Sequence, residues 1–228
     1  MLWLKIWLET RWQVAFMIVL GAIPLLGAAT IRNAPTDVRA LAVTSFVWII
    51  VPIILAGSGI DTASGAPLDW TRGAEGSTPF TLSLPVTRSR LFAMRTIAGI
   101  LETILLLALY LIVTSWLLLP SPGPSLADAL RHLAAAGACS LAVYCLSACL
   151  STFIQESWRI RASMLAIALL FVLASMRSLP PWADIFRPFV LQSPLLTHQM
   201  PWATIGVAVG LSALFLFGGL KIAQLRDY

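Results

Sequence analysis

Residues 12–31 read WQVAFMIVLGAIPLLGAATI and contain no charged side chain. A helix needs about 20 apolar residues to cross the roughly 30 Å hydrocarbon core of a bilayer. This stretch therefore has the length and the composition of a transmembrane helix. It lies between Arg11 and Arg32, and windows of the same kind recur along the rest of the chain.

Five further windows follow, and Glu102 is the only charged residue that any of them contains. The windows are residues 40–60, 96–127, 132–155, 162–176 and 188–220. Residues 162–176 are short for a span. They reach the required length only if the flanking arginines extend their side chains to the membrane interface. A re-entrant segment at this position, with five full spans elsewhere, is the alternative.

These windows predict an all-α integral membrane protein that forms a single transmembrane domain, residues 1–228, with six transmembrane helices. We expect the spans at about residues 12–31, 40–60, 96–119, 132–154, 161–179 and 203–221.

The composition excludes most classes of soluble protein. Of the 228 residues, 59% are hydrophobic and only 11% are charged, whereas soluble domains are about 25% charged. A chain of this length cannot bury so much apolar surface in one aqueous core. A soluble enzyme domain, a disordered chain, a disulfide-stapled secreted module and a nucleic-acid binder are therefore excluded.

Lysine and arginine predict the orientation, since basic residues gather on the cytoplasmic side of a membrane. With six spans and an inner N-terminus, the inner segments hold Lys5, Arg11, Arg72, Arg88, Arg90, Arg95, Arg159, Arg161, Lys221 and Arg226. The outer segments hold Arg32, Arg39, Arg131, Arg177 and Arg187. The inner excess predicts a multi-pass membrane protein with both termini in the cytoplasm.

Two segments outside the spans have patterns of their own. Residues 1–11 place polar and apolar side chains on different sides of a helix, which predicts a helix lying in the inner interface. The ragged start of the first span is the alternative. Residues 177–202 contain five prolines in an apolar sequence. Because proline interrupts helices, we expect a broken outer segment of short helices that dip into the membrane.

The longest predicted cytoplasmic segment runs from residue 61 to residue 95, and residues 75–90 read EGSTPFTLSLPVTRSR. Thr78 is a good N-cap and Pro79 a good first residue for a short helix, which Pro85 ends. Thr87 caps a second helix that continues into the third span. A short helix held in this way suits contact with a soluble partner. An ordinary loop, whose arginines only set the topology, is equally compatible with these residues.

The sequence shows no catalytic or metal-binding motif. His132 and His198 lie far apart without adjacent acidic ligands, and we interpret both as interfacial residues. No Gly-rich phosphate-binding loop is present, so the chain does not bind ATP by that route. We interpret Cys139, Cys145 and Cys149 as buried small apolar residues of the fourth span.

Glu102 is the only charged residue within a predicted span, about 10 Å beyond Arg95 along the helix. An acid inside a membrane is costly unless it is paired or hydrated. Glu102 is therefore a candidate for a translocation pathway or gate. A structural ion pair with an arginine near the inner interface is the alternative. Gly206 and Gly210 form a Gly-x-x-x-Gly pattern that favours close helix packing within one subunit or between two.

The stretch from Glu75 to Arg95 resembles the permease subunits of ABC-2 type transporters. Those permeases carry an acidic residue, Gly, and Ser or Thr, followed by an apolar run that ends in Ser-Leu-Pro-Val-Ser/Thr-Arg. Here the same positions hold residues 75–78 and then LSLPVTR at residues 82–88. The chain differs at Pro79 and Phe80, where the family more often has a Leu-Glu-like pair. The six spans and the broken segment before the last span match the family layout.

The resemblance implies that this chain is the membrane-spanning subunit of an exporter of the bacterial inner membrane. It would pair with a second permease copy, either identical or a paralogue, and with separate ABC ATPase subunits that bind ATP and Mg. The chain itself would bind no cofactor or nucleic acid and would contact the membrane lipids around it. The residues expected to contact the ATPase are Glu75, Gly76, Ser77, Thr78, Pro79, Phe80, Leu82, Ser83 and Arg88.

The apolar pathway expected for such a subunit suits an amphiphile, a peptide, a lipid or a drug-like molecule. In the family, the broken outer segment forms a pair of re-entrant helices that close the pathway on the outside. A non-transporting membrane scaffold or sensor subunit is an alternative. An intramembrane lipid-modifying enzyme is a weaker alternative, because only Glu102 supplies a charged group within the spans.

Overall fold

The computed structural model describes residues 14–15, 18–19, 47–56, 88–118, 125–152, 154, 156–175, 180–189 and 193–225. This part of the chain is 87% helical and contains no β-strand. The predicted all-α fold is therefore confirmed for the described residues.

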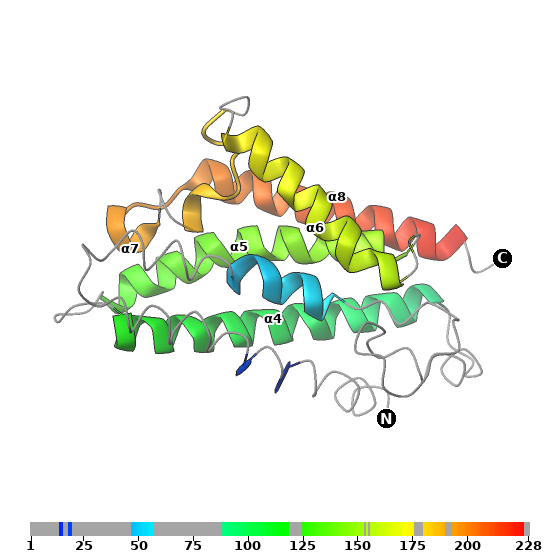
Figure 1. The fold of residues 1–228 in the computed structure, drawn as a ribbon, viewed down its shortest axis with the longest axis horizontal. Helices are drawn as coiled ribbons and strands as arrows, with labels where there is room; N and C mark the ends of the chain where they lie inside the picture. The colour runs from blue at the N-terminus through cyan, green and yellow to red at the C-terminus, as the bar shows by residue number, and fades with distance from the viewer. Residues whose placement is uncertain are drawn as a thin grey trace.

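Residues 47–55 form a short helix, and the labelled elements follow it along the chain (Figure 1). These elements are α4 (Arg88–Leu118), α5 (Leu126–Leu150), α6 (Glu156–Ser175), the 3₁₀ turn η2 (Arg187–Phe189), α7 (Pro194–Thr197) and α8 (Trp202–Leu225).

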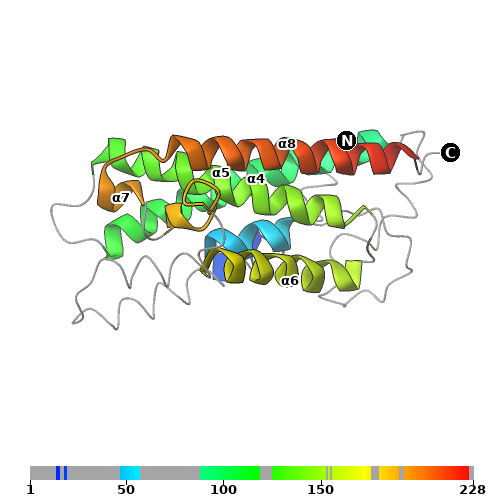
Figure 2. The ribbon, with the colours of Figure 1, turned by 90° about the horizontal axis from the view of Figure 1, so that it is seen from above.

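The long helices form an elongated bundle with α5 in the middle, in contact with α4, α6, α7 and α8. Helices α5 and α8 run in one direction and α4 and α6 in the other (Figures 1 and 2). We call one end of the bundle the basic end, where Arg90, Arg161 and Lys221 lie at the starts of α4 and α6 and near the end of α8. The opposite end, with His132 and His198, is the histidine end.

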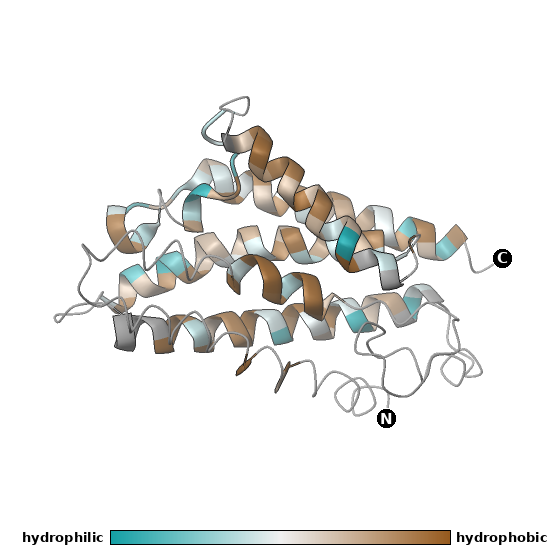
Figure 3. Cartoon of the chain, viewed as in Figure 1, coloured by the Kyte–Doolittle hydropathy of each residue, from teal (hydrophilic) through white to brown (hydrophobic). Residues whose placement is uncertain are grey.

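Three described helices are long and apolar enough to cross a membrane: Phe92–Val113, Leu126–Leu150 and Trp202–Leu225. A shorter apolar helix covers Ile160–Ala174. Hydrophobic residues fill the middle of the bundle, and hydrophilic ones gather toward its ends (Figure 3). These observations support a membrane protein. The predicted interfacial helix and most of the first two predicted spans lie outside the described residues, so the count of six spans stays a prediction.

The helix boundaries follow the local sequence. Helix α4 begins at Arg88, immediately after the cap predicted at residue 87. Helix α5 begins at Leu126, before the predicted span at residue 132, because Ser125 caps its first turn. The first six residues of α5, residues 126–131, therefore extend the helix beyond the charge-free window and include Asp128 and Arg131.

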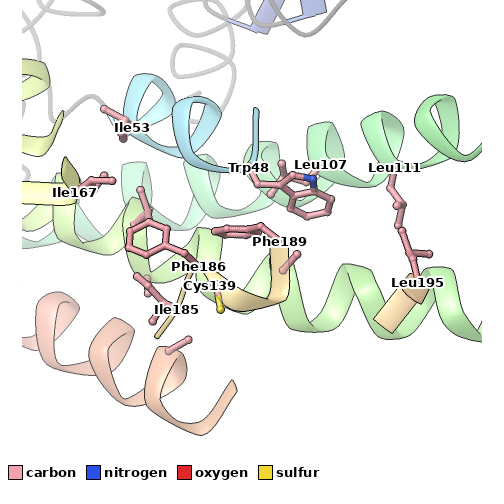
Figure 4. Close-up of a cluster of buried hydrophobic side chains, with 14 residues drawn as sticks. Trp48, Ile53, Leu107, Leu111, Cys139, Ile167, Ile185, Phe186, Phe189 and Leu195 are labelled. Carbon is pink, nitrogen blue, oxygen red and sulfur yellow. The ribbon is translucent and has the colours of Figure 1, made fainter. Parts of the chain in front are cut away.

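The segment between α6 and α8 is broken, as its prolines predict. Residues 181–186 form turns, and η2 and α7 are only three and four residues long. Phe186, Phe189 and Leu195 are nevertheless buried, in one apolar cluster with Trp48 and Leu107 (Figure 4). The segment therefore packs against the bundle through its apolar side chains.

Hydrogen bonds tie α5 to its neighbours across the apolar interior. Ser140 Oγ donates to the backbone oxygen of Trp48 at 2.7 Å. Ser163 Oγ of α6 donates to Ser147 Oγ at 2.9 Å. Hydroxyl groups of this kind hold helices together where no water competes for them.

Helices α4 and α5 are in close contact where Gly99 faces Tyr144. The Tyr144 hydroxyl donates to the Thr96 backbone oxygen of α4 at 3.4 Å. A Cβ atom at position 99 would lie 2.8 Å from Tyr144 Cζ, which is too short for any real contact. The absence of a side chain at Gly99 is therefore what admits the buried tyrosine ring.

We expect Gly99→Ala to lower the free energy of unfolding by about 1 to 3 kcal/mol, because the buried ring has to shift to admit the methyl group. Thermal unfolding of the purified protein in detergent measures the effect. Gly206→Ala is the matched control, since no atom lies within 4 Å of a Cβ at that position. Equal stability of the two variants would contradict this account of the α4–α5 contact.

Candidate functional site

The residues predicted to contact an ATPase fall mainly outside the described part of the chain. Residues 75–83 are not among the described residues, so their predicted role stays a prediction. Arg88 is the first residue of α4. The predicted contact stretch therefore leads directly into a helix of 31 residues.

Glu102 lies on α4 inside the apolar stretch Phe92–Val113. Its side chain is partly buried, and its Oε2 atom is inaccessible to solvent. Arg95 is buried two turns earlier on the same helix. The placement of Glu102 within a span is therefore supported, while its role as a gate or as a structural ion pair stays a prediction.

A polar cluster that the sequence did not predict lies at the histidine end. It comprises Ser125, Asp128, Arg131 and His132 at the start of α5, and Ser193 and His198 on either side of α7. We call these six residues the end cluster. It joins α5 to the segment between α6 and α8.

The capping of α5 fixes the position of Asp128. Ser125 Oγ accepts a hydrogen bond from the backbone N–H of Asp128 at 3.1 Å and donates to Asp128 Oδ2 at 2.7 Å. This reciprocal arrangement resembles a capping box, in which the cap and the third helical residue bind each other. The Asp128 side chain is thereby held against the helix, with only 9% of it exposed.

His198 and Arg131 converge on that carboxylate. His198 Nδ1 lies 2.9 Å from Asp128 Oδ2, and Arg131 donates to Asp128 Oδ1 at 2.9 Å. Arg131 also donates to the backbone oxygen of His198 at 3.4 Å. The prediction that neither histidine has an adjacent acidic group is therefore wrong for His198. The chain brings Asp128 and His198 together across 70 residues.

The backbone around α7 presents His198 to α5. Ser193 caps α7, Pro194 occupies its first turn, and the helix ends after one turn. His198 then adopts a left-handed conformation, with φ of 54°, which few residues other than glycine adopt. Its backbone N–H donates to the Pro194 oxygen at 3.0 Å. This reversal turns the imidazole toward Asp128.

His132 makes a second connection, deeper in the bundle. His132 Nδ1 and Ser193 Oγ lie 3.0 Å apart, and both residues are buried. The imidazole also meets the Trp48 ring edge-on, with centroids 5.1 Å apart. His132 is therefore a buried contact residue that joins three segments, and its interpretation as a plain interfacial residue is wrong.

The geometry of the end cluster is suited to holding α5 and the segment between α6 and α8 together, and it is not arranged for catalysis. Asp128 lies between Ser125 and His198, so the serine faces the carboxylate, whereas nucleophile activation requires the serine to face the imidazole. Ser193 does contact His132, but both side chains are enclosed. Among the described residues, no group of three His, Cys, Asp or Glu side chains is spaced to hold a metal ion.

Comparisons with known proteins do not assign a family. No family model matches the chain, and no curated protein or solved structure matches it. The end cluster and the coupling stretch are therefore interpreted from this chain alone.

The sequence contains patterns that predict part of the end cluster. Ser125 and Asp128 have the spacing of a capping box, and Asp128 and His132 are four residues apart, on one face of a helix. Neither pattern identifies His198 as the partner. That contact depends on the left-handed turn after α7, and the sequence around His198 contains no glycine to mark it.

We expect His132→Phe to destabilise the protein by about 1 to 3 kcal/mol, because it leaves the buried Ser193 hydroxyl without its ring partner. Phenylalanine keeps an aromatic ring beside Trp48. Ser193→Ala removes the other partner, and the double variant tests whether the two losses are shared. Chemical denaturation in detergent measures all three. Strictly additive losses would show that the His132–Ser193 contact contributes nothing to stability.

Proposed function

We propose that this chain is the permease subunit of an ABC-2 type exporter that moves an amphiphilic, peptide, lipid or drug-like cargo by alternating access. A separate ATPase subunit would supply the energy. The observation that carries the proposal is the stretch at residues 75–88, which has the family motif and whose last residue, Arg88, is the first residue of α4.

The length of α4 supports a coupling role for that stretch. Its 31 residues span about 46 Å at the usual helical rise, which exceeds the roughly 30 Å hydrocarbon core of a bilayer. The helix therefore extends beyond the membrane toward residues 75–87. A displacement of that stretch by a soluble subunit would move α4 and, through the Gly99–Tyr144 contact, α5 with it.

The broken segment between α6 and α8 is proposed as the re-entrant element that closes the pathway on the outer side. Its apolar residues pack into the bundle, which is what a non-helical segment at membrane depth requires. The end cluster would fasten it to α5 in the closed state. Opening to the outside would then break the contacts of Asp128 with His198 and of His132 with Ser193.

Glu102 is proposed to lie near the inner part of the pathway. It is 14 residues beyond Arg88, which places it about 21 Å along α4. A partly buried carboxylate at that depth would interact with a cationic group of a cargo or with a neighbouring arginine. The chain itself would bind no nucleotide, and ATP with Mg would occupy the ATPase subunit.

The coupling role is tested by co-expressing the chain with candidate ABC ATPase subunits from the same genome. We expect the purified chain alone to show no ATP hydrolysis, and the co-expressed pair to copurify and hydrolyse ATP. Glu75→Lys is expected to remove most of the ATPase that copurifies, because it reverses the charge at the docking stretch. Asp69→Lys is the control, since it makes the same charge change six residues away in the same segment.

A normal yield of complex and normal ATP hydrolysis with Glu75→Lys would refute the docking role. Failure of any nucleotide-binding chain to form a complex would refute the proposed function. A complex that forms normally yet moves no cargo and shows no cargo-stimulated hydrolysis would favour the scaffold or sensor alternative.

The gating role of the broken segment is tested by cross-linking it reversibly to α5. In a background with the three native cysteines replaced, Asp128→Cys and His198→Cys are joined by a short bis-methanethiosulfonate cross-linker, which attaches to each thiol through a reducible disulfide bond. We expect the cross-linked complex to lose most of its ATP hydrolysis and to regain it on reduction, because α5 and the segment can no longer separate. Each single-cysteine variant, treated in the same way, is the control. Full activity of the cross-linked pair would contradict a gate at this position.

A further inference from the structure

Helix α8 has one exposed face along its whole length. That face is apolar over most of the helix and becomes positively charged at the basic end. From Trp202 onward, the exposed residues are apolar or small until Lys221. They include Ala203, Gly206, Gly210, Ala213, Leu214 and Phe217. Trp202 and Lys221 are 19 residues apart, or about 28 Å along the helix. This length matches the hydrocarbon core of a bilayer.

The cation that ends this face is stacked on an aromatic ring. Lys221 Nζ lies 5.7 Å from the centroid of the Phe217 ring. Both side chains are exposed, and Phe217 retains 62% of its accessible surface. A lysine ammonium is therefore held beside an apolar ring on the outside of the bundle.

Helix α6 repeats the arrangement. Its exposed face runs through Trp158, Arg161, Leu165, Leu169 and Val172, at the spacing of a helical stripe. The Arg161 guanidinium carbon lies 4.9 Å from the centroid of the Trp158 ring. Trp158 is 56% exposed. Here too a cation stacked on an exposed aromatic ring ends an apolar stripe.

The two pairs lie at the same end of the bundle, on different helices. The start of α6 and the end of α8 both lie at the basic end (Figures 1 and 2), and the apolar middle of the bundle ends there (Figure 3). Within the part of the chain that the structure describes, neither Arg161 nor Lys221 lies within salt-bridge distance of a carboxylate. Both positive charges therefore face outward without a counter-charge from the described protein.

We propose that these two cation–aromatic pairs are binding sites for the headgroups of anionic phospholipids. At this depth the ring lies among the upper acyl chains and glycerol groups, while the cation meets the lipid phosphate. A zwitterionic lipid carries its own positive charge, whereas an anionic headgroup supplies a net negative charge near the cation. The aromatic ring fixes the cation at the interface and strengthens its contact.

Lipid fits this surface better than a soluble protein partner. Each pair continues an apolar stripe along the side of the bundle, where acyl chains are the neighbours of a transmembrane helix. The contact stretch proposed for the ATPase, residues 75–88, is a separate part of the chain. The lipid sites require only that the protein lies in a membrane, and they do not rest on the proposed transport function.

The test uses the full chain, purified in detergent and titrated with phosphatidylglycerol or phosphatidylcholine, with bound lipids counted by native mass spectrometry. We expect Arg161→Gln and Lys221→Gln each to weaken phosphatidylglycerol binding about fivefold at its own site, and the double variant to weaken it about fivefold at both sites, with phosphatidylcholine binding unchanged. Lys221→Arg should retain phosphatidylglycerol binding, because it keeps the positive charge. Trp158→Leu should weaken phosphatidylglycerol binding at the α6 site about twofold to fivefold. Arg131→Gln, at the opposite end, is the matched control.

Undiminished phosphatidylglycerol binding by the double variant would overturn the proposal, provided that its thermal unfolding matches that of the unaltered protein. An equal loss with Arg131→Gln would also overturn it, since the effect would then be one of total charge. Loss of a copurifying soluble subunit with lipid binding intact would assign the surface to a protein partner instead.

Discussion

Hydrogen bonds and close contacts made by α5 hold the described bundle together. Inside a bilayer, apolar packing alone gains little, because lipid tails are as apolar as leucine side chains. Association between helices then depends on hydrogen bonds between their polar groups and on small residues that allow the helix backbones to approach closely. Helix α5 supplies both, with Ser140 and Ser147 bonded to neighbouring segments and Tyr144 seated against Gly99.

The same constraint explains the broken segment between α6 and α8. Prolines prevent a continuous helix there, so backbone groups are left to find other partners. Short elements solve part of the problem, since Ser193 caps α7 and the His198 N–H returns to the Pro194 oxygen. The apolar side chains pack against Trp48 and α5, which buries the segment in protein and shields its backbone from the lipid tails. Two polar contacts, at Asp128 and His132, then position the segment at the histidine end.

The two ends of the bundle carry different chemistry. At the histidine end, the side chains of Asp128, Arg131 and His198 contact one another and close a contact within the chain. At the basic end, Arg161 and Lys221 are stacked on aromatic rings and point outward. An exporter subunit would use the first end to govern opening and the second to hold its position in the membrane.

Charge-free lengths and prolines were enough to predict the helical membrane class and the break before α8, and the cap at Thr87 predicted the start of α4 at Arg88. Each of these features depends on the chemistry of adjacent residues. The end cluster was beyond such reasoning. The left-handed backbone at His198 has no glycine to mark it, and its contact with Asp128 crosses 70 residues. The Gly99–Tyr144 approach is likewise a property of two packed helices. The two residues of each such contact lie on different segments, so the packing of the whole bundle determines which residues meet.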